Sequence, residues 1–464
     1  MEAPTHPPLE VVRSPWFGFS AVAVGTLMAT LDGSIVNVAL PTLRRELGAS
    51  FAGVEWVVAG YLLVISALLL AAGRLGDILG HRRVYTGGLL LFTIGSGFCG
   101  VAHALGTLVA ARTLQGLGAS AMMAMGPAIV TATFPPERRG RALGAITSVV
   151  AVGLTLGPPL GGFIVQHLSW RWIFLPNLPI GVAGAVWASQ VLPGTRPPRP
   201  AGLDRPGALL LAVAFGAGVA AIQSSADGGA RSAVLAGVAL IAGALLVRHT
   251  RRVPAPVVDP ALFGDRVFTA GIAAGLLSYS ALFTSSFLTP FFLAHVKELS
   301  AGGLGAMLTA VPLALSVSSP AAGWLSDRFG PRLLCPMGMA ILSAGLATLA
   351  LAGPGDGLPS IAARLAACGV GMGLFQPPNN SSVMGTLPRE RLGSGGGMLA
   401  TARNVGMVIG IALSGALFRA RGGASGDVPS FLAGYRAALL AGACLAILSG
   451  AASLARDARR RSTI

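Results

Sequence analysis

Charged residues are scarce in this sequence. They make up only 11% of its 464 residues, whereas ordinary soluble domains contain about 25%. Hydrophobic residues reach 53%, and the mean hydropathy is +0.72. These values exclude an ordinary soluble globular domain. Apolar runs of roughly 20 residues, the length that crosses a hydrocarbon core about 30 Å thick, recur along the chain. We therefore expect an all-α integral membrane protein without a large soluble domain.

Negative charge is scarcer than positive charge. The chain has 17 acidic residues against 33 lysines and arginines, which gives a formal net charge of +16. A nucleic-acid partner could explain such an excess, but the arginines form short clusters between apolar runs, with almost no lysine and no interleaved aromatic residues. We interpret them as residues that set the membrane topology, and we expect the lipid bilayer, not a nucleic acid, as the partner.

Cysteine and histidine are too few and too scattered to predict a metal site. The four cysteines lie in apolar segments without Cys-x-x-Cys spacing. The six histidines lie in termini and loops without the spacing of metal ligands. Residues 116–121, GLGASA, match a dinucleotide-binding pattern, but they lie within an apolar span and follow no strand. We expect no metal, no cofactor and no enzymatic activity.

Fourteen apolar segments are long enough to be transmembrane helices. The first carries Asp32 and is too long for the apolar core of a cleaved signal peptide, so we interpret it as a permanent span. An even number of spans places both termini on one side of the membrane. The predicted spans cover residues 16–40, 54–73, 84–102, 107–132, 142–166, 171–191, 207–224, 232–247, 268–293, 303–324, 333–352, 359–380, 396–418 and 432–453.

The arginines orient these spans. Segments on the side of the termini carry 22 of the 33 basic residues, the opposite loops carry 8, and the spans carry 3. Because positive residues concentrate on the cytoplasmic side of membrane proteins, we predict a multi-pass protein of the cell membrane with both termini in the cytoplasm. Arg419 and Arg421 lie on the opposite side, and the sequence does not explain them.

The two halves of the chain repeat each other. Gly-x-Leu-x-Asp-x-x-Gly-x-Arg occurs at residues 73–82 and again at 323–332, and PPERRG and PRERLG recur at a similar offset. Six spans per copy account for twelve of the fourteen, and the two remaining spans form a hairpin at 207–247. We predict a six-helix bundle at 1–192, a linker with the extra hairpin at 193–266, and a second six-helix bundle at 267–464. Parallel repeats of this kind are typical of transporters, although duplication could also build a mere membrane scaffold.

Asp32 is the only acidic residue well inside a predicted span; Glu55 lies at the outer start of the second. An ionisable side chain in hydrocarbon costs about 3 kcal/mol or more and indicates a function. At 1.5 Å per residue, Asp32 lies about 12 Å and Arg112 about 8 Å from the outer end of its helix. We expect the two to face one cavity and to pair, as a proton switch. The alternative for Asp32 is a static clamp between helices.

Glycines at intervals of four mark one face of the fifth span. This spacing permits close approach to a neighbouring helix, and the prolines there remove backbone donors and permit a bend. Tight packing is one interpretation, and a seal against ion leakage between the bundles is another. The residues concerned are Gly153, Gly157, Pro158, Gly161 and Gly162.

Aromatic side chains crowd the ninth span, where Tyr279, Phe283 and Phe287 follow at intervals of four. Such a stripe can face lipid or core, or it can line a pocket for a planar apolar substrate. We include these three residues and Arg403 in a possible substrate cavity. Arg364 and Arg403 have no acid at matching depth in their own half, so we expect contacts with backbone carbonyls or with an anionic part of the substrate.

The repeated Gly/Asp/Arg stretch lies at helix ends on the predicted cytoplasmic side. Charge pairs there can hold the inner side of the bundles closed and release it during transport. Topology marking alone would explain the arginines but not the repeated aspartates and glycines. The predicted gate consists of Gly73, Asp77, Gly80, Arg82, Arg83, Asp327, Arg328 and Arg332.

These motifs resemble those of the major facilitator superfamily, specifically its fourteen-span drug:proton antiporter branch. GRLGDILGHRR resembles the signature loop between helices two and three, and GWLSDRFGPR resembles its second copy. LVAARTLQGLGAS resembles the fourth-helix motif whose arginine, here Arg112, the family implicates in proton coupling, and GLTLGPPLGG resembles the antiporter motif of exporters. LDGSIVNVALP and WVVAGYLL resemble motifs of the branch, in which the acid at Asp32 is functional.

The residues and the resemblance together predict a proton-driven exporter of hydrophobic or amphiphilic small molecules, such as drugs or antibiotics, that works as a monomer by rocking of two bundles. One alternative is a facilitator or importer of a polar solute. Another is a membrane-embedded enzyme or signalling protein, for which the sequence contains no catalytic constellation or soluble module.

Overall fold

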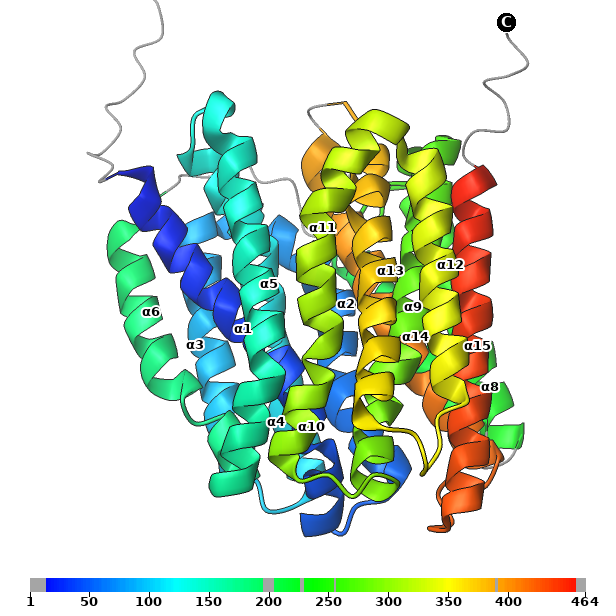
Figure 1. The fold of residues 1–464 in the computed structure, drawn as a ribbon. Coiled ribbons are helices and arrows are strands. Elements are labelled where there is room, and N and C mark those ends of the chain that lie inside the picture. Colours follow the sequence, from blue (N-terminus) through cyan, green and yellow to red (C-terminus); the bar gives the residue numbers. More distant parts are fainter. Residues whose placement is uncertain (1–13, 195–203, 226–228, 254–255, 389–390, 456–464) are drawn as a thin grey trace, which may run out of the picture.

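The computed structural model describes residues 14–194, 204–225, 229–253, 256–388 and 391–455, without the side chains of residues 136, 137, 327, 392 and 393. The described elements are all helical (Figure 1). They are α1 Pro15–Glu46, α2 Phe51–Leu79, α3 His81–Gly100, α4 Leu105–Thr133, α5 Pro136–His167, η1 Trp170–Ile173, α6 Asn177–Val191, α7 Arg205–Ser224, α8 Gly229–Thr250, η2 Pro260–Gly264, α9 Arg266–His295, α10 Ala301–Leu308, α11 Ala310–Phe329, α12 Pro331–Ala350, α13 Leu358–Met384, α14 Leu392–Ala420 and α15 Val428–Leu454.

Thirteen helical segments within the described ranges are long and apolar enough to cross a membrane. They correspond to thirteen of the fourteen predicted spans. The remaining predicted span, 84–102, is helical as α3, but it lies outside this set because its glycines and basic first turn lower its hydropathy. The predicted span 303–324 is built from two helices, α10 and α11, which meet at Thr309.

Short polar side chains start several of the helices. The side chains of Ser50, Asp265, Ser300 and Asp427 each accept a hydrogen bond from a backbone N–H in the first turn of α2, α9, α10 and α15, respectively. These caps satisfy donors that a helix start otherwise leaves unpaired. Each of these residues therefore marks the position at which a new helix begins.

The two ends of the molecule differ in which chain segments they carry. α1 begins and α15 ends at the same end, which we call the terminal end; the opposite end is the far end (Figure 1).

α7 packs against α8, and α7 also contacts α2 and α14. Only 6% of the most apolar window of α8 is buried. An apolar helix with so little protein contact suits a position facing lipid.

The predicted internal repeat is present in the packing. α3 packs on α4 where Gly118 lies against the backbone of Phe92, and α12 packs on α13 where Gly371 lies against the backbone of Leu342. Gly371 and Leu342 thus follow Gly118 and Phe92 in the chain by about 250 residues. Residues 116–121 therefore belong to a helix-packing surface, and the match to a dinucleotide pattern has a structural explanation.

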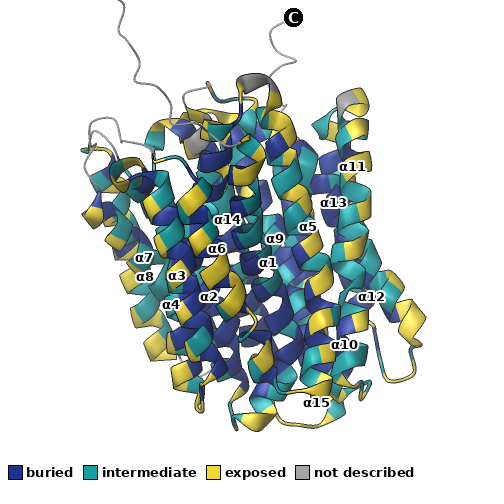
Figure 2. Cartoon of the chain, turned by 90° about the vertical axis from the view of Figure 1, so that its left-hand side faces the viewer, coloured by how far each residue is buried: buried dark blue, intermediate teal, exposed yellow. Residues whose placement is uncertain are grey.

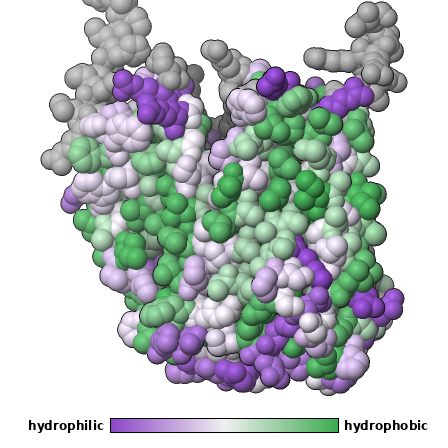
Figure 3. Space-filling view, viewed as in Figure 1, coloured by the Kyte–Doolittle hydropathy of each residue, from purple (hydrophilic) through white to green (hydrophobic). Residues whose placement is uncertain are grey.

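Burial and polarity follow the membrane geometry. Buried positions concentrate in the interior of the helical assembly, and exposed positions lie on the outward faces (Figure 2). Apolar residues cover much of the sides, whereas hydrophilic residues gather toward the two ends (Figure 3). Figure 3 also shows a hollow at the terminal end, between the half that carries α1 and the half that carries α12.

The repeated glycines of the two motif copies have a backbone role. Gly80 has φ +92° and Gly330 has φ +76°, and each separates two consecutive helices, α2 from α3 and α11 from α12. L-residues rarely adopt such positive φ values, so glycine is required at both turns. This explains why the glycine recurs in both copies of the motif.

Replacing Gly80 with alanine is expected to destabilise the protein by about 1–2 kcal/mol, because a Cβ disfavours positive φ. The matched control is Gly73→Ala, which lies inside α2 with no atom near the added methyl group. The control should unfold at or above the temperature of the unmodified protein. Thermal unfolding in detergent measures both, and equal midpoints for the two variants would contradict the backbone role.

Candidate proton-coupling site and substrate pocket

Asp32 and Arg112 form an ion pair between α1 and α4. Arg112 Nη1 lies 2.5 Å from Asp32 Oδ2, and the side chains of Arg112 and Asp32 are 1% and 0% exposed, respectively. The predicted pairing is therefore present. The prediction that both residues face a cavity is wrong for this conformation, because the pair is enclosed among helices of the first half. An ion pair so deeply desolvated is stable only when its remaining polar atoms are also hydrogen-bonded.

Gln115 completes the hydrogen bonding of Asp32. Its Nε2 donates to Asp32 Oδ1 at 2.9 Å, and its Oε1 accepts a hydrogen bond from Arg112 Nη1 at 2.7 Å. Gln115 also donates to Ser96 on α3 at 3.3 Å, and Ser96 in turn accepts from Asn177 on α6 at 3.0 Å. The network thus joins four helices. The sequence contained a signal for Gln115, because a residue three positions after Arg112 shares its helix face.

Two further contacts hold the Arg112 guanidinium. Its Nε donates to the backbone carbonyl of Val57 at 3.2 Å. Its Cζ lies 3.9 Å from the centroid of the Tyr61 ring, a cation–π contact. Both partners lie on α2, in the WVVAGYLL stretch. The arginine is therefore positioned by α2 and α4 and paired with α1. A change in the charge of Asp32 would therefore alter the contacts among all three helices.

The glycine face of α5 packs against the part of α1 that carries Asp32. A side chain at Gly153, Gly157 or Gly161 would overlap Thr30, Ser34 or Ile35 of α1, respectively. Ser34 also donates to the backbone carbonyl of Gly153 at 3.2 Å. The predicted close approach is confirmed, and it places the glycine face beside the ion pair.

Gly162 faces the other half of the molecule. A Cβ at this position would lie 2.5 Å from the carbonyl oxygen of Ala301 and 3.1 Å from the Cα of Gly305, both on α10. The carbonyl oxygen of Pro158 contacts the same glycine of α10. This contact between backbones joins α5 and α10, one helix from each half. The sequence motif therefore has two faces, one toward α1 and one across the halves.

The predicted gate is only partly assembled. Asp77 is 63% exposed and pairs with His81 at 3.6 Å, one turn later in the chain. No described ion pair joins it to Arg82 or Arg83 in this conformation, and the gate itself stays a prediction. The exposed position of Asp77 at the end of α2 lets solvent replace such partners. The side chain of Asp327 lies outside the described residues, and Arg328 and Arg332 are exposed.

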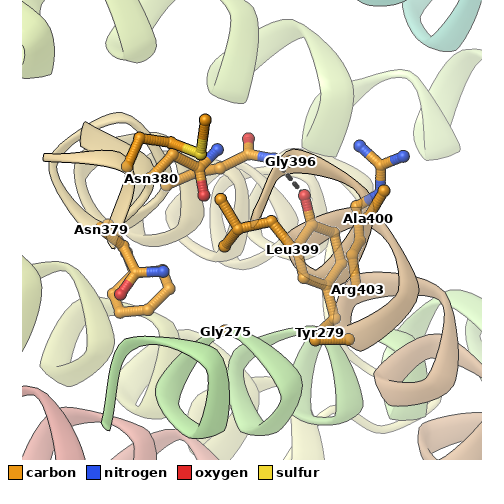
Figure 4. Close-up of a pocket in the computed structure, with 12 residues that line it drawn as sticks. Gly275, Tyr279, Asn379, Asn380, Gly396, Leu399, Ala400 and Arg403 are labelled. Carbon is orange, nitrogen blue, oxygen red and sulfur yellow. Dashed lines mark hydrogen bonds between the residues drawn. The ribbon is translucent and has the colours of Figure 1, made fainter. Parts of the chain in front are cut away.

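A pocket of about 290 Å³ lies among α9, α13 and α14 (Figure 4). Tyr279 and Arg403 line it, as predicted. Gln376 donates a hydrogen bond to the Tyr279 hydroxyl. Arg403 interacts with the same hydroxyl, and its Nε has no hydrogen-bond partner among the described residues. The pocket therefore combines an aromatic wall with hydrogen-bonding groups.

Phe283 and Phe287 do not line this pocket, so the pocket does not support their placement in the substrate cavity. Phe287 is 1% exposed and packs with Phe51 and Phe291 in an aromatic cluster. Phe283 packs against Gly410 of α14. Side chains four apart drift around a helix of 3.6 residues per turn, and this drift carries the later members of the stripe away from Tyr279.

The polar wall of the pocket consists of residues that were not among the predicted site residues. Gln376, Asn379 and Asn380 all line it, and Asn379 donates to the carbonyl of Gly271 at 3.2 Å. Figure 4 shows Asn379, Asn380 and Leu399 around the same space as Tyr279. The signal was the stretch QPPNN, three amide side chains within a predicted span. Amides at this depth are costly unless they serve a partner or a ligand.

The remaining in-span arginine has an acidic partner after all. Arg364 Nη2 lies 3.0 Å from Asp356 Oδ1. Asp356 lies in the loop before α13, where backbone donation from Gly353 and the nearby Arg364 lower its pKa below the ordinary value. The expectation of backbone or substrate contacts for Arg364 is therefore wrong, because the loop folds back over the helix start.

The fold and these sites define a multi-pass membrane protein with a buried charge pair in one half and a pocket in the other. A family model for the Major Facilitator Superfamily matches residues 22–411 and, in a second match, residues 272–463. The chain belongs to the Major Facilitator Superfamily, a family of membrane transporters, and the resemblance drawn from its motifs is confirmed.

Named relatives and a solved structure agree with this assignment. The chain is 35% identical over 408 residues to the riboflavin transporter RibZ of Clostridioides difficile (strain 630), covering 88% of this chain and 89% of that protein. It is 30% identical over 423 residues to the tetracenomycin C resistance and export protein of Streptomyces glaucescens, covering 90% and 79%. A crystal structure of a bacterial homolog to the human lysosomal transporter Spinster has the same fold, with a TM-score of 0.69 at 14% identity over 95% of this chain and 96% of that one.

Proposed function

We propose that the protein exports hydrophobic or amphiphilic small molecules, such as drugs or antibiotics, across the cell membrane in exchange for protons. The observation that carries this proposal is the buried Asp32–Arg112 pair with both carboxylate oxygens engaged. Protonating Asp32 would remove its attraction to the guanidinium, which α2 and α4 also hold. Helix positions that depend on that attraction would then shift, and this links proton binding to conformation.

The proposed architecture has fourteen spans, which adds α3 to the thirteen strongly apolar segments. Residues 1–192 and 267–464 would form the two six-helix bundles, and 193–266 would supply a linker with α7 and α8 as an extra hairpin. Both termini would lie in the cytoplasm, as the arginine distribution indicates. The pair and the pocket occur within one chain, so we propose that a monomer is sufficient for transport.

The proposed conformational cycle is a rocking of the two bundles. α5 and α10 touch through backbones near the far end, while the space-filling surface is hollowed at the terminal end (Figure 3). This arrangement suits a state open toward the cytoplasm. In the opposite state the gate residues Asp77 and Asp327 would meet arginines of the facing half and hold the terminal end closed.

The pocket supports an amphiphilic substrate. Its aromatic and apolar wall, with Tyr279, Phe375 and Leu399, suits a flat apolar surface, whereas the amides and Arg403 suit an edge rich in hydrogen-bond acceptors. Arg403 would prefer partial or full negative charge on that edge. The Arg403 Nε has no hydrogen-bond partner among the described residues, so it can donate a hydrogen bond to an acceptor of the substrate.

The second candidate is facilitated movement or import of a polar solute. It is favoured by the similarity to a relative named as a riboflavin transporter and by the amide side chains of the pocket. The similarity to a relative named for resistance and export favours the first candidate. The two candidate functions differ in the direction of transport and in proton coupling, and the fold is compatible with both.

Inverted membrane vesicles with an imposed pH gradient test the proposal. Adding tetracycline-like, cationic and flavin compounds in turn should release protons from the acidic lumen for at least one compound, and that compound should accumulate against its gradient. Uptake that runs only down the compound's own gradient, and that is unchanged when the pH gradient is collapsed, would favour the facilitator and contradict proton coupling. Vesicles from cells that carry the empty vector give the background.

A further inference from the structure

A second buried carboxylate lies at the far end, between the two halves. Glu55 lies one turn into α2 and its side chain is 0% exposed. Arg419, near the end of α14, places Nη1 2.8 Å from Glu55 Oε2. Gln223, near the end of α7, donates from Nε2 to Glu55 Oε1 at 2.9 Å. One carboxylate therefore connects the first half, the second half and the helix pair α7–α8.

The surroundings are shaped for a charged carboxylate. Arg419 also donates from Nη2 to the backbone carbonyl of Gln223 at 2.5 Å, so the two partners of Glu55 are held to each other. A side chain at Gly415 of α14 would overlap the Glu55 carboxylate. The surface of α14 thus has space for this group only because a glycine stands there.

An aromatic cluster shields the charges from solvent. The Phe51 ring, one turn before Glu55 on α2, stacks on Phe418 of α14 with centroids 4.6 Å apart. It also contacts Phe287 and Phe291 of α9, at 5.3 and 4.9 Å. Removing one member of a shielded ion pair leaves an uncompensated buried charge, which is strongly unfavourable. Separation of the halves at this end therefore depends on the charge of Glu55.

Basic, acidic and titratable groups all lie at this end, because exposed Glu46 ends α1 and Asp427 caps α15. Arg44 of α1 lies 5.8 Å from the Phe51 ring, Arg421 follows directly after α14, and His295 ends α9. Arg44 and Arg421 raise the positive potential near the carboxylate and favour its ionised form while the far end is closed. Once the far end opens, water replaces these interactions and protonation becomes easier.

We propose that Glu55 is a second proton-binding site, one that responds to the pH of the far side. Ionised Glu55 binds Arg419 and Gln223 and keeps the far end closed. A proton taken up there neutralises it, weakens both contacts and shifts the population toward a state open at the far end. This inference rests on the proposed rocking cycle, and it assigns functions to Glu55 and Arg419 that the Asp32 site does not require.

Distances between spin labels at the far end test the inference in the full-length protein in liposomes. Exposed positions His103 and Ala424 are replaced with labelled cysteine, one in each half, after Cys444→Ser. Lowering the pH from 8 to 5 should increase about tenfold the ratio of molecules with the long label-to-label distance to molecules with the short one. This is the change expected for loss of a charged hydrogen bond. Glu55→Gln should show the long distance at both pH values.

The matched control is Glu46→Gln, which removes an exposed acid at the same end of the molecule and should keep the pH response. If Glu55→Gln does not fold, the charge-neutral variant Glu55→Gln/Arg419→Met provides the same test. A pH response that persists without Glu55, or no lengthening of the distance in the unmodified protein, would overturn the inference. The response should also survive Asp32→Asn, so failure of proton coupling at Asp32 is distinguishable from failure here.

Discussion

Replacing Asp32 with asparagine is expected to abolish proton-coupled transport. The amide preserves the shape of the side chain but not its charge, so Arg112 loses its only described ion-pair partner while Gln115 and Val57 still hold it. Removing one member of a buried ion pair costs about 3–5 kcal/mol. Substrate-induced proton release from inverted vesicles should fall to the background of empty-vector vesicles.

A charge-neutral variant separates coupling from folding. Asp32→Asn/Arg112→Gln removes both charges, so it should be more stable than Asp32→Asn alone but should remain uncoupled. Thermal unfolding and proton release are measured on the same preparations. Proton release that persists in either variant would remove Asp32 from the proton path and leave the static clamp as its role.

Replacing Gly162 with valine is expected to reduce transport about 10- to 100-fold. The added carbon atoms would meet the Ala301 carbonyl oxygen and the Gly305 Cα, which are backbone atoms and cannot rotate away. Overpacking of this kind costs about 1–3 kcal/mol, and here the cost falls on the state in which α5 and α10 touch. Initial rates of substrate uptake into inverted vesicles measure the effect.

Gly144→Val is the matched control on the same helix, because no atom lies near a Cβ at that position. Its transport rate should stay close to that of the unmodified protein, and both variants should insert into the membrane in equal amounts. Comparable rates for the two variants would show that the α5–α10 contact is not needed for the transport cycle.

The spacing of residues within single helices was enough to predict several parts of the site. Asp32 and Arg112 were expected to pair because helical rise placed them at similar depths, and the structure joins them. The glycines of α5 were expected to allow a close approach, and α1 makes it. Gln115 and the amides of QPPNN were also accessible to such reasoning, since polar side chains within spans are uncommon.

Contacts that depend on how separate helices meet were missed or wrong. Arg419 had no explanation in the sequence, because its partner Glu55 lies 364 residues earlier in the chain. Phe287 was placed in a substrate cavity, although it packs with Phe51 of α2. Arg364 was left without an acid because a loop brings Asp356 to it. No periodicity within one helix records which face of a distant helix it will meet.

Hydrophobic length and repeated motifs are properties of local segments, so they were enough to predict a helical membrane protein with two related halves. The enclosure of Asp32 and the position of Glu55 between both halves and α7 became visible only in the three-dimensional packing. Burial and charge pairing depend on the packing of helices from distant parts of the chain, and that packing arises from many weak contacts at once.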